Sequence, residues 1–200
     1  MSSECPASSH RGECPVQINP ANNMPMENTL QGSSTDEVAK TLSCDREIST
    51  IPRADTESTW QYPSARMFYN ALYRKSKPVS ADAIPSMLAI HNGLNEQVWQ
   101  EIVQYEKYLN PKCVPKLKRF MGRPEKLSPR AWWHVKVRGG EAPFDRHDWF
   151  IERCDQEVRY VIDYYSGHPE TGLATFSVDI RPALDSPQSF LDRFRLFLHK

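Results

Sequence analysis

The spacing of apolar residues predicts one long helix near the middle of the chain. Between residues 87 and 109 the apolar side chains recur at steps of three, four or seven, which places them on one helix face: Met87, Leu94, Val98, Ile102, Tyr105 and Leu109. His91 lies on the same face, four residues after Met87. A histidine there either satisfies both ring nitrogens locally or gives one of them to another partner, such as a metal. The pattern alone favours an ordinary core histidine.

Other patterns predict two further helices and a sheet. One helix is expected over 65–75, behind an N-cap at Ser64, and another begins at Ser186-Pro187 and carries several phenylalanines. The strands are expected over 132–137, 148–153, 158–165 and 174–180, with residues 154–157 joining the second and third as a hairpin. Because the strands cluster after the helices, we predict an α+β fold in which helices pack on an antiparallel sheet.

Composition divides the chain into two parts. Residues 1–48 are poor in aromatics and rich in Ser, Asn, Pro, Thr and Glu, so they cannot bury enough apolar surface to offset the cost of ordering. We therefore predict a disordered tail over 1–48, with a short helix over 36–42, and one folded domain over 49–200.

Charge and hydropathy exclude several classes of function. The 25 basic and 25 acidic residues cancel, so no global field favours nucleic acid. No run approaches the roughly 18 apolar residues of a membrane span, and the N-terminus has no secretory signal pattern. The protein is expected to be soluble or peripheral. From Lys112 to Arg138 nine basic residues stand against one acid, and three prolines interrupt them. This predicts a basic loop suited to carboxylates, phosphates or an anionic membrane.

The five cysteines indicate neither a zinc site nor a disulfide framework, because their number is odd and no CxxC occurs. Cys5 and Cys14 are each followed by proline. A Cys-Pro pair keeps its thiolate in an extended, exposed chain, where it can ligate haem iron. The dipeptide alone is a weak signal.

Polar and aromatic residues around the predicted helices and strands supply the candidate site. Asn92 and Glu96 are four apart on the long helix, but Glu96 lies about 140° around the helix from His91, and its ordinary role would be a solvated carboxylate. Three more groups stand out elsewhere: Trp60 and Tyr62 directly before a helix, His147 among Asp145, Arg146 and Asp148, and Arg153 and Arg159 on either side of the hairpin turn.

Six short sequence motifs follow one another between residues 51 and 187: Ile51–Asp55, Trp60–Ser64, Ile90–Asn92 with Asn95–Gln97, Pro143–Trp149, Glu157–Tyr165 and Asp179–Ser186. Jointly they resemble one family, the holocytochrome c synthases, also called cytochrome c haem lyases. The Cys14-Pro15-Val16 string resembles the haem-regulatory motifs found in the tails of that family.

The resemblance implies an enzyme of the mitochondrial intermembrane space, held peripherally on the inner membrane. It would join the two vinyl groups of haem b to the CxxCH cysteines of apocytochrome c through thioether bonds. In the family the histidine of the Ile-His-Asn string is an axial ligand of the haem iron, so the resemblance assigns that role to His91 and outweighs the core-histidine interpretation.

The same resemblance suggests roles for the other candidates. Trp60 and Tyr62 would form the pocket wall, with Asn92 and Glu96 beside the ligand. His147 would support the site rather than bind iron, because its neighbours can satisfy both ring nitrogens. Arg153, Arg159 and the basic loop are candidates for the haem propionates, and Cys5 and Cys14 are further candidate iron ligands.

Differences from the family pattern leave the substrate open. The family carries tryptophan after the first helix, where this chain has Tyr73–Pro78, and phenylalanines replace tryptophans in the last helix. Apocytochrome c, apocytochrome c1 or both remain candidates. Two other functions would use the same residues: a haem sensor or carrier without covalent chemistry, and an apocytochrome c chaperone in which His91 is a core residue.

Overall fold

The computed structural model describes residues 18–19, 24–25, 39, 41–74, 77, 79–123, 125–167 and 176–199. Cys5, Cys14, most of the predicted tail and most of the predicted helix over 36–42 lie outside the described residues. In the N-terminal part, β1 (Ile18–Asn19) pairs with β2 (Met24–Pro25), and β3 (Ile48–Pro52) pairs with β4 (Thr59–Gln61). None of the helices in the described ranges is long and apolar enough to cross a membrane.

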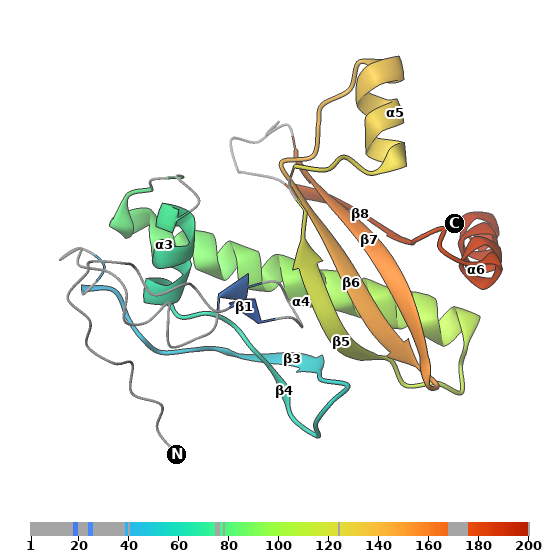
Figure 1. Ribbon diagram of the computed structural model, residues 1–200, viewed down its shortest axis with the longest axis horizontal. Coiled ribbons are helices and arrows are strands. Elements are labelled where there is room, and N and C mark those ends of the chain that lie inside the picture. Colours follow the sequence, from blue (N-terminus) through green and yellow to red (C-terminus); the bar gives the residue numbers. More distant parts are fainter. Residues whose placement is uncertain are drawn as a thin grey trace, which may run out of the picture.

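The centre of the fold is a four-stranded antiparallel sheet in the order β5-β6-β7-β8 (Figure 1). Its strands are β5 (Lys116–Gly122), β6 (Asp145–Arg153), β7 (Gln156–Ser166) and β8 (Phe176–Pro182). The β6–β7 hairpin closes on the pair Arg153 and Gln156, with Cys154 and Asp155 at positive φ in the turn, a backbone conformation that tight hairpins require. The predicted hairpin and the α+β class are confirmed.

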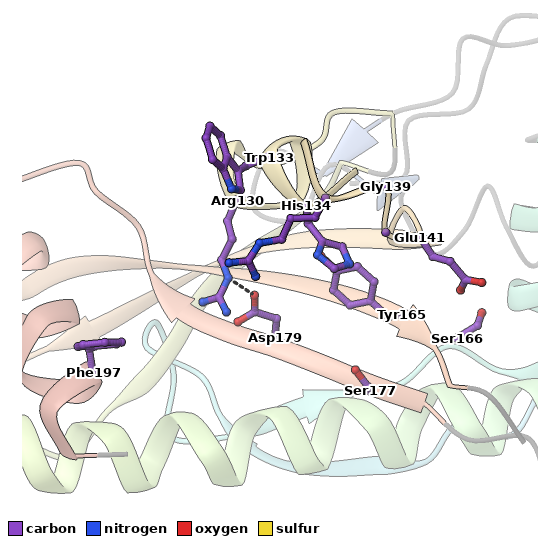
Figure 2. A pocket seen from close by; sticks show the side chains of 12 residues that line it. Arg130, Trp133, His134, Gly139, Glu141, Tyr165, Ser166, Ser177, Asp179 and Phe197 are labelled. Atoms are coloured by element: carbon purple, nitrogen blue, oxygen red, sulfur yellow. Dashed lines mark ion pairs between the residues drawn. The ribbon is translucent and has the colours of Figure 1, made fainter. Parts of the chain in front are cut away.

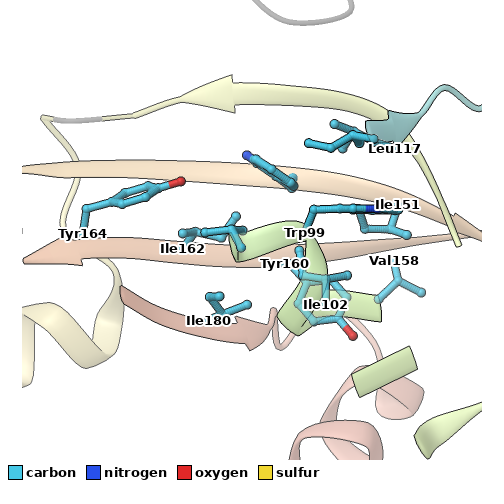
Figure 3. Close-up of a cluster of buried hydrophobic side chains, with 12 residues drawn as sticks. Trp99, Ile102, Leu117, Ile151, Val158, Tyr160, Ile162, Tyr164 and Ile180 are labelled. Carbon is cyan, nitrogen blue, oxygen red and sulfur yellow. The ribbon is translucent and has the colours of Figure 1, made fainter. Parts of the chain in front are cut away.

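The predicted long helix is confirmed as α4 (Ile84–Leu109), which crosses one face of this sheet (Figure 1). It begins three residues earlier than the pattern predicted, with a proline in its first turn. Backbone N–H groups in the first turn have no acceptor within the helix, so the N–H that proline lacks removes no hydrogen bond. Its second half forms the core: Val98, Trp99 and Ile102 pack on Ile151, Tyr160 and Ile162 of the sheet (Figure 3). Burying these large apolar side chains is the main stabilising contribution to the fold.

The first half of α4 extends beyond the sheet, and other elements pack on one side of it (Figure 1). Helix α3 (Ala65–Arg74) packs against it, preceded by the predicted N-cap Ser64, whose Oγ accepts from the Met67 amide. A short 3₁₀ helix, η1 (Ala81–Ala83), leads into α4. Strand β3 also contacts α4, and the Ala54 amide donates to the Leu117 carbonyl at 3.1 Å, which joins the β3–β4 hairpin to β5.

Two predictions for the basic stretch were wrong. Residues 132–137 form no strand but belong to α5 (Pro129–Arg138), because Ser128 caps the helix by accepting from the Ala131 amide and Gly139 ends it at φ 65°. Lys116–Gly122 is not a loop but the edge strand β5, paired with β6. Here the local signals at each end of the helix outweigh the strand-like alternation between them.

The expectation of no disulfide was also wrong, since Cys113 is bonded to Cys154. The two residues are 41 positions apart in the sequence. Lys116 of β5 pairs with Glu152 of β6, so the chain before β5 comes to lie beside the β6–β7 turn, and the two Cα atoms are 5.5 Å apart. Cysteine spacing cannot reveal a pairing that depends on this register.

The last helix is confirmed as α6 (Pro187–His199), beside β8 and the end of α4 (Figure 1). Its buried side chains are Ser189, Asp192 and Leu196. Asp192 is ion-paired with Arg153 at 2.8 Å, which attaches the helix to the end of β6.

Candidate functional site

His91 lies on the first half of α4, outside the hydrophobic core, where α4 packs against α3. Its imidazole is half-buried, and its ring centroid is 5.6 Å from that of Phe68 on α3. Nδ2 of Asn95, one turn further along, is 3.3 Å from Nδ1 and 3.4 Å from Nε2 of His91, and it donates to the His91 carbonyl at 2.9 Å. The Asn95 side-chain amide therefore lies about equally close to both ring nitrogens of His91.

Asn95 also connects His91 to the sheet. Its Oδ1 accepts a hydrogen bond from the Tyr164 hydroxyl at 3.3 Å, and the Tyr164 ring is 5.4 Å from the ring of His147. Both His147 and Tyr164 stand on the strand positions that face α4, in step with Trp149 and Tyr160 of the core. The structure thus brings the two predicted histidines to one region, from a helix and a strand respectively.

His147 has a partner for one ring nitrogen only. Its Nε2 lies 3.3 Å from Oδ2 of Asp145, while its Nδ1 is buried and has no hydrogen-bond partner in the described part of the chain. We expected neighbouring side chains to satisfy both nitrogens. The expectation therefore holds for Nε2 but not for Nδ1.

A row of aromatic rings crosses the sheet beside these histidines. Neighbouring centroids are 5.4–6.4 Å apart along Trp60, Phe120, His147, Tyr164, Phe144 and Phe176, which is the range of favourable ring packing. Trp60 is fixed by a 3.2 Å hydrogen bond from its Nε1 to the Leu117 carbonyl. Sequence reasoning found Trp60 and His147 but missed Phe120, because its strand was expected to be a loop.

Glu96 holds strand β3 on α4. Its carboxylate accepts from Ser49 Oγ at 2.6 Å, from the Thr50 amide at 3.1 Å, from the Thr50 hydroxyl and from Tyr62 Oη at 2.9 Å. Burial alone would raise the pKa of Glu96, but the hydrogen bonds from Ser49, Thr50 and Tyr62 hold it below its ordinary value. Glu96 is therefore a charged acceptor rather than a solvated carboxylate.

Tyr62 and Asn92 belong to the same arrangement. Burial and the neighbouring Glu96 carboxylate raise the pKa of the buried Tyr62, so its hydroxyl stays protonated and donates. Asn92 donates from Nδ2 to Oε2 of Glu47 at 2.7 Å, again linking α4 to the segment before β3. These side chains position β3 and β4 next to His91, and direct contact between them and a ligand stays a prediction.

The structure does not bring Arg153 or Arg159 to His91. Arg153 is buried with Glu106, fifteen residues beyond His91 on α4, which is about 22 Å along the helix axis. Arg159 lies on the opposite face of the sheet, ion-paired with Asp148 and Asp185. Arg53 is the cation beside the aromatic row, since its guanidinium carbon is 4.8 Å from the Trp60 ring centroid. Sequence reasoning missed this residue, although it lies in one of the matched strings.

A separate cavity lies on the opposite face of the sheet, between α5, the ends of β7 and β8, and α6 (Figure 2). Its volume is about 880 Å³, and its lining includes Arg130, Trp133, His134, Tyr165 and Phe197. Arg130 and Arg138 of the basic stretch line it, but neither His91, His147 nor the aromatic row does, so it is treated separately below.

The arrangement around His91 suits a planar metal complex. A neutral imidazole is a normal axial ligand of haem iron, and flat aromatic side chains offer surfaces on which a porphyrin can pack. The unpartnered Nδ1 of His147 adds a polar atom beside the same rings. These residue types are therefore compatible with a bound haem.

Comparison with known proteins finds related sequences over most of the chain. A family model described as "Cytochrome c/c1 heme lyase" matches residues 2–197. The chain is 43% identical to a holocytochrome-c synthase of Saccharomyces cerevisiae, over all of this chain and 84% of the relative. It is 42% identical to a human holocytochrome c-type synthase, over 96% of this chain and 74% of the relative. A putative holocytochrome-c1 synthase of Schizosaccharomyces pombe is 40% identical, over 77% and 74% respectively. No solved structure matches the chain.

Proposed function

We infer the activity of this protein from the family to which the chain belongs, the cytochrome c/c1 haem lyases. We propose that it attaches haem to the two cysteines of a CxxCH motif in an apocytochrome. Each cysteine S–H adds across one haem vinyl group, so that a C–S bond and a C–H bond form and no electrons are exchanged. The substrate brings both thiols, and the enzyme therefore contributes mainly by positioning them.

His91 is the proposed axial ligand of the iron of haem b. The observation that supports this role most directly is its location, half-buried at the junction of α3 and α4 beside an aromatic row and outside the core. The histidine of the substrate motif would take the opposite haem face, which brings the neighbouring cysteines beside the vinyl groups. His147 supports the site from β6 rather than binding iron.

The remaining candidates have supporting roles in this proposal. Trp60 and Phe120 form part of the haem-contacting wall, while Tyr62, Asn92 and Glu96 hold β3 and β4 in place beside it. Arg53, which lies over Trp60 and is ion-paired with Asp55 at 2.7 Å, is the proposed cation for a propionate. Cys5 and Cys14 stay candidate iron ligands on the strength of their Cys-Pro pairs.

The proposed substrates are haem b with apocytochrome c, apocytochrome c1 or both, because relatives named for each cytochrome are 40–43% identical to this chain. The proposed location is the mitochondrial intermembrane space, peripheral on the inner membrane. No nucleic-acid partner is proposed, since the charges balance over the whole chain.

Co-expression with apocytochrome c in a bacterium that lacks its own attachment system tests the proposal. Haem staining of a denaturing gel should show a cytochrome band that is lost with His91→Ala. The matched control is His134→Ala, which removes an imidazole from the opposite face of the sheet and should leave the band intact.

Three other results would contradict parts of the proposal. Full staining with His91→Ala would exclude the axial-ligand role. Haem that copurifies with this protein while neither apocytochrome c nor apocytochrome c1 is stained would indicate a sensor or carrier. Binding of apocytochrome c that does not depend on haem, without covalent product, would indicate a chaperone.

A further inference from the structure

Helix α6 turns its apolar side chains toward solvent. Residues at steps of four, seven and eight form one exposed stripe, with exposed fractions of 59, 52, 76 and 68%: Phe190, Phe194, Phe197 and Leu198. The side that packs on the protein instead carries Ser189, Asp192 and Leu196. This is the reverse of an ordinary surface helix, whose apolar stripe faces the core.

Helix α5 presents a similar surface next to it. Trp132, Trp133 and Val137 are exposed, and Ala131 is the one residue of this helix that is buried. The two helices share the 880 Å³ cavity, because Trp133 of α5 and Phe197 of α6 both line it (Figure 2). The exposed side chains of α5 and α6 on either side of this cavity are called here the α5–α6 surface.

The helices of this surface carry an excess of cations, although Arg130 is ion-paired with Asp179 at 3.3 Å and Glu141 also lines the cavity. Helix α5 carries three cations and no acid, and α6 carries two arginines and one acid: Arg130, Lys136, Arg138, Arg193, Arg195 and Asp192. Asp192 is buried and ion-paired with Arg153, so it does not offset the exposed cations. Burial and the charges of Arg181 and Arg130 lower the pKa of Arg193, and the Asp179 carboxylate opposes this shift, so Arg193 lies among cations from α5 and β8 and one acid.

Exposed aromatic rings mixed with arginines are typical of surfaces that lie at the level of lipid headgroups, where rings insert and cations meet phosphates. A second copy of this chain docked by the same surface would bring like charges together, which opposes self-association. We propose that the α5–α6 surface docks the protein on an anionic lipid bilayer. The proposal adds a docking surface to the peripheral membrane association proposed above. It rests on the proposed function only for which membrane the protein binds.

The docked orientation would leave the candidate haem site accessible. The cavity between α5 and α6 is bordered by Tyr165 and Asp179, which face away from α4, whereas His91, His147 and Tyr164 lie on the α4 side of the sheet. The lipid-facing surface and the haem-facing surface are therefore on different sides of the sheet.

Vesicle co-sedimentation of the full chain tests this proposal. We expect binding to vesicles of phosphatidylcholine with phosphatidylglycerol, and much weaker binding to phosphatidylcholine alone. Phe194→Ser with Phe197→Ser should weaken binding about tenfold for each ring that enters the bilayer. Arg138→Gln with Arg195→Gln should weaken it about fivefold for each charge, and this part should shrink at high salt.

Ile48→Ser is the matched control, because Ile48 is 68% exposed on β3, which packs on β4, α4 and β5. It should bind vesicles as the unchanged protein does. The altered phenylalanines are exposed, so circular dichroism should show the same fold in all variants. No binding by the unchanged chain, or equal binding by the double phenylalanine variant, would overturn the proposal. Self-association that the same variant abolishes, with no vesicle binding, would overturn it in favour of a dimer.

Haem attachment to soluble apocytochrome c, measured without vesicles, separates this proposal from the proposed function. The double phenylalanine variant should retain that activity. Loss of vesicle binding with attachment intact in the variant supports docking at this surface, whereas vesicle binding by an unchanged chain that attaches no haem would contradict the proposed function alone.

Discussion

Replacing Arg153 with methionine should destabilise the fold by leaving two buried carboxylates without their cation. Arg153 lies 2.7 Å from Oε2 of Glu106, an ion pair without the alignment of a hydrogen bond, and 2.8 Å from Oδ2 of Asp192. All three side chains are buried, and Tyr160 adds a 2.6 Å hydrogen bond to Glu106. Removing one partner of such a buried network costs about 3–5 kcal/mol. For a chain of this length, the melting temperature should fall by about 10 °C.

The loss should depend on pH in a defined direction. Burial raises the pKa of Glu106 above its ordinary 4.5, and the hydrogen bond from Tyr160 and the charge of Arg153 partly oppose that rise. Without Arg153 the pKa of Glu106 rises further. An acid with a raised folded-state pKa carries no penalty below its unfolded pKa, and stability is lost as pH increases through the folded value. The deficit of Arg153→Met relative to the unchanged protein should therefore grow from pH 4.5 upward.

Thermal and urea unfolding at several pH values would measure this deficit. The control is Arg153→Met combined with Glu106→Gln, which removes the charge that Arg153 neutralised and should restore at least about 1 kcal/mol at neutral pH. A loss below about 1 kcal/mol, or a deficit that stays constant with pH, would refute the buried network as the attachment of α6 to β6 and α4.

Three further changes test other parts of the structure. Cys113→Ser should lower stability by about 4 kcal/mol, because the bond to Cys154 closes a long loop. Dithiothreitol should lower the melting temperature of the unchanged protein to that of the variant. Equal melting temperatures of the two proteins without dithiothreitol would contradict the bond. Glu96→Gln should cost about 1–2 kcal/mol at neutral pH. Since hydrogen bonds lower the pKa of Glu96, this difference should disappear as pH falls below the ordinary 4.5, and a difference unchanged in acid would count against the charged acceptor. Ser128→Ala removes a helix cap whose hydroxyl also donates to Asp163 at 2.6 Å, so it should lower stability by about 2 kcal/mol. It should speed amide hydrogen exchange in α5 but not in α4. Equal acceleration in both helices would indicate global rather than local loosening.

Local patterns predicted the elements that local interactions determine. The stripe from Met87 to Leu109 is long and regular, so α4 could be assigned from spacing alone, and the turn residues 154–157 marked the β6–β7 hairpin. The pattern over 132–137 failed because alternation in so short a segment is ambiguous. The cap at Ser128 and the glycine at 139 carried the correct signal.

Contacts between distant segments could not be predicted from the sequence. Glu96 receives its hydrogen bonds from residues more than thirty positions earlier, and Arg153 finds Glu106 only because β6 crosses α4 at that point. The resemblance to known strings selected His91, but it did not show that Asn95 and Tyr164 connect that residue to His147. Such pairings follow from strand register and helix placement, which a single sequence does not encode in local form.

The division of α4 between core and site has an evolutionary consequence. The helix is about 39 Å long, and its apolar side chains from Val98 onward hold the sheet while His91 stands nearer its start. Residues around His91, the proposed axial ligand, lie outside this packing. We therefore expect them to vary among descendants of this protein with less effect on folding stability than residues from Val98 onward.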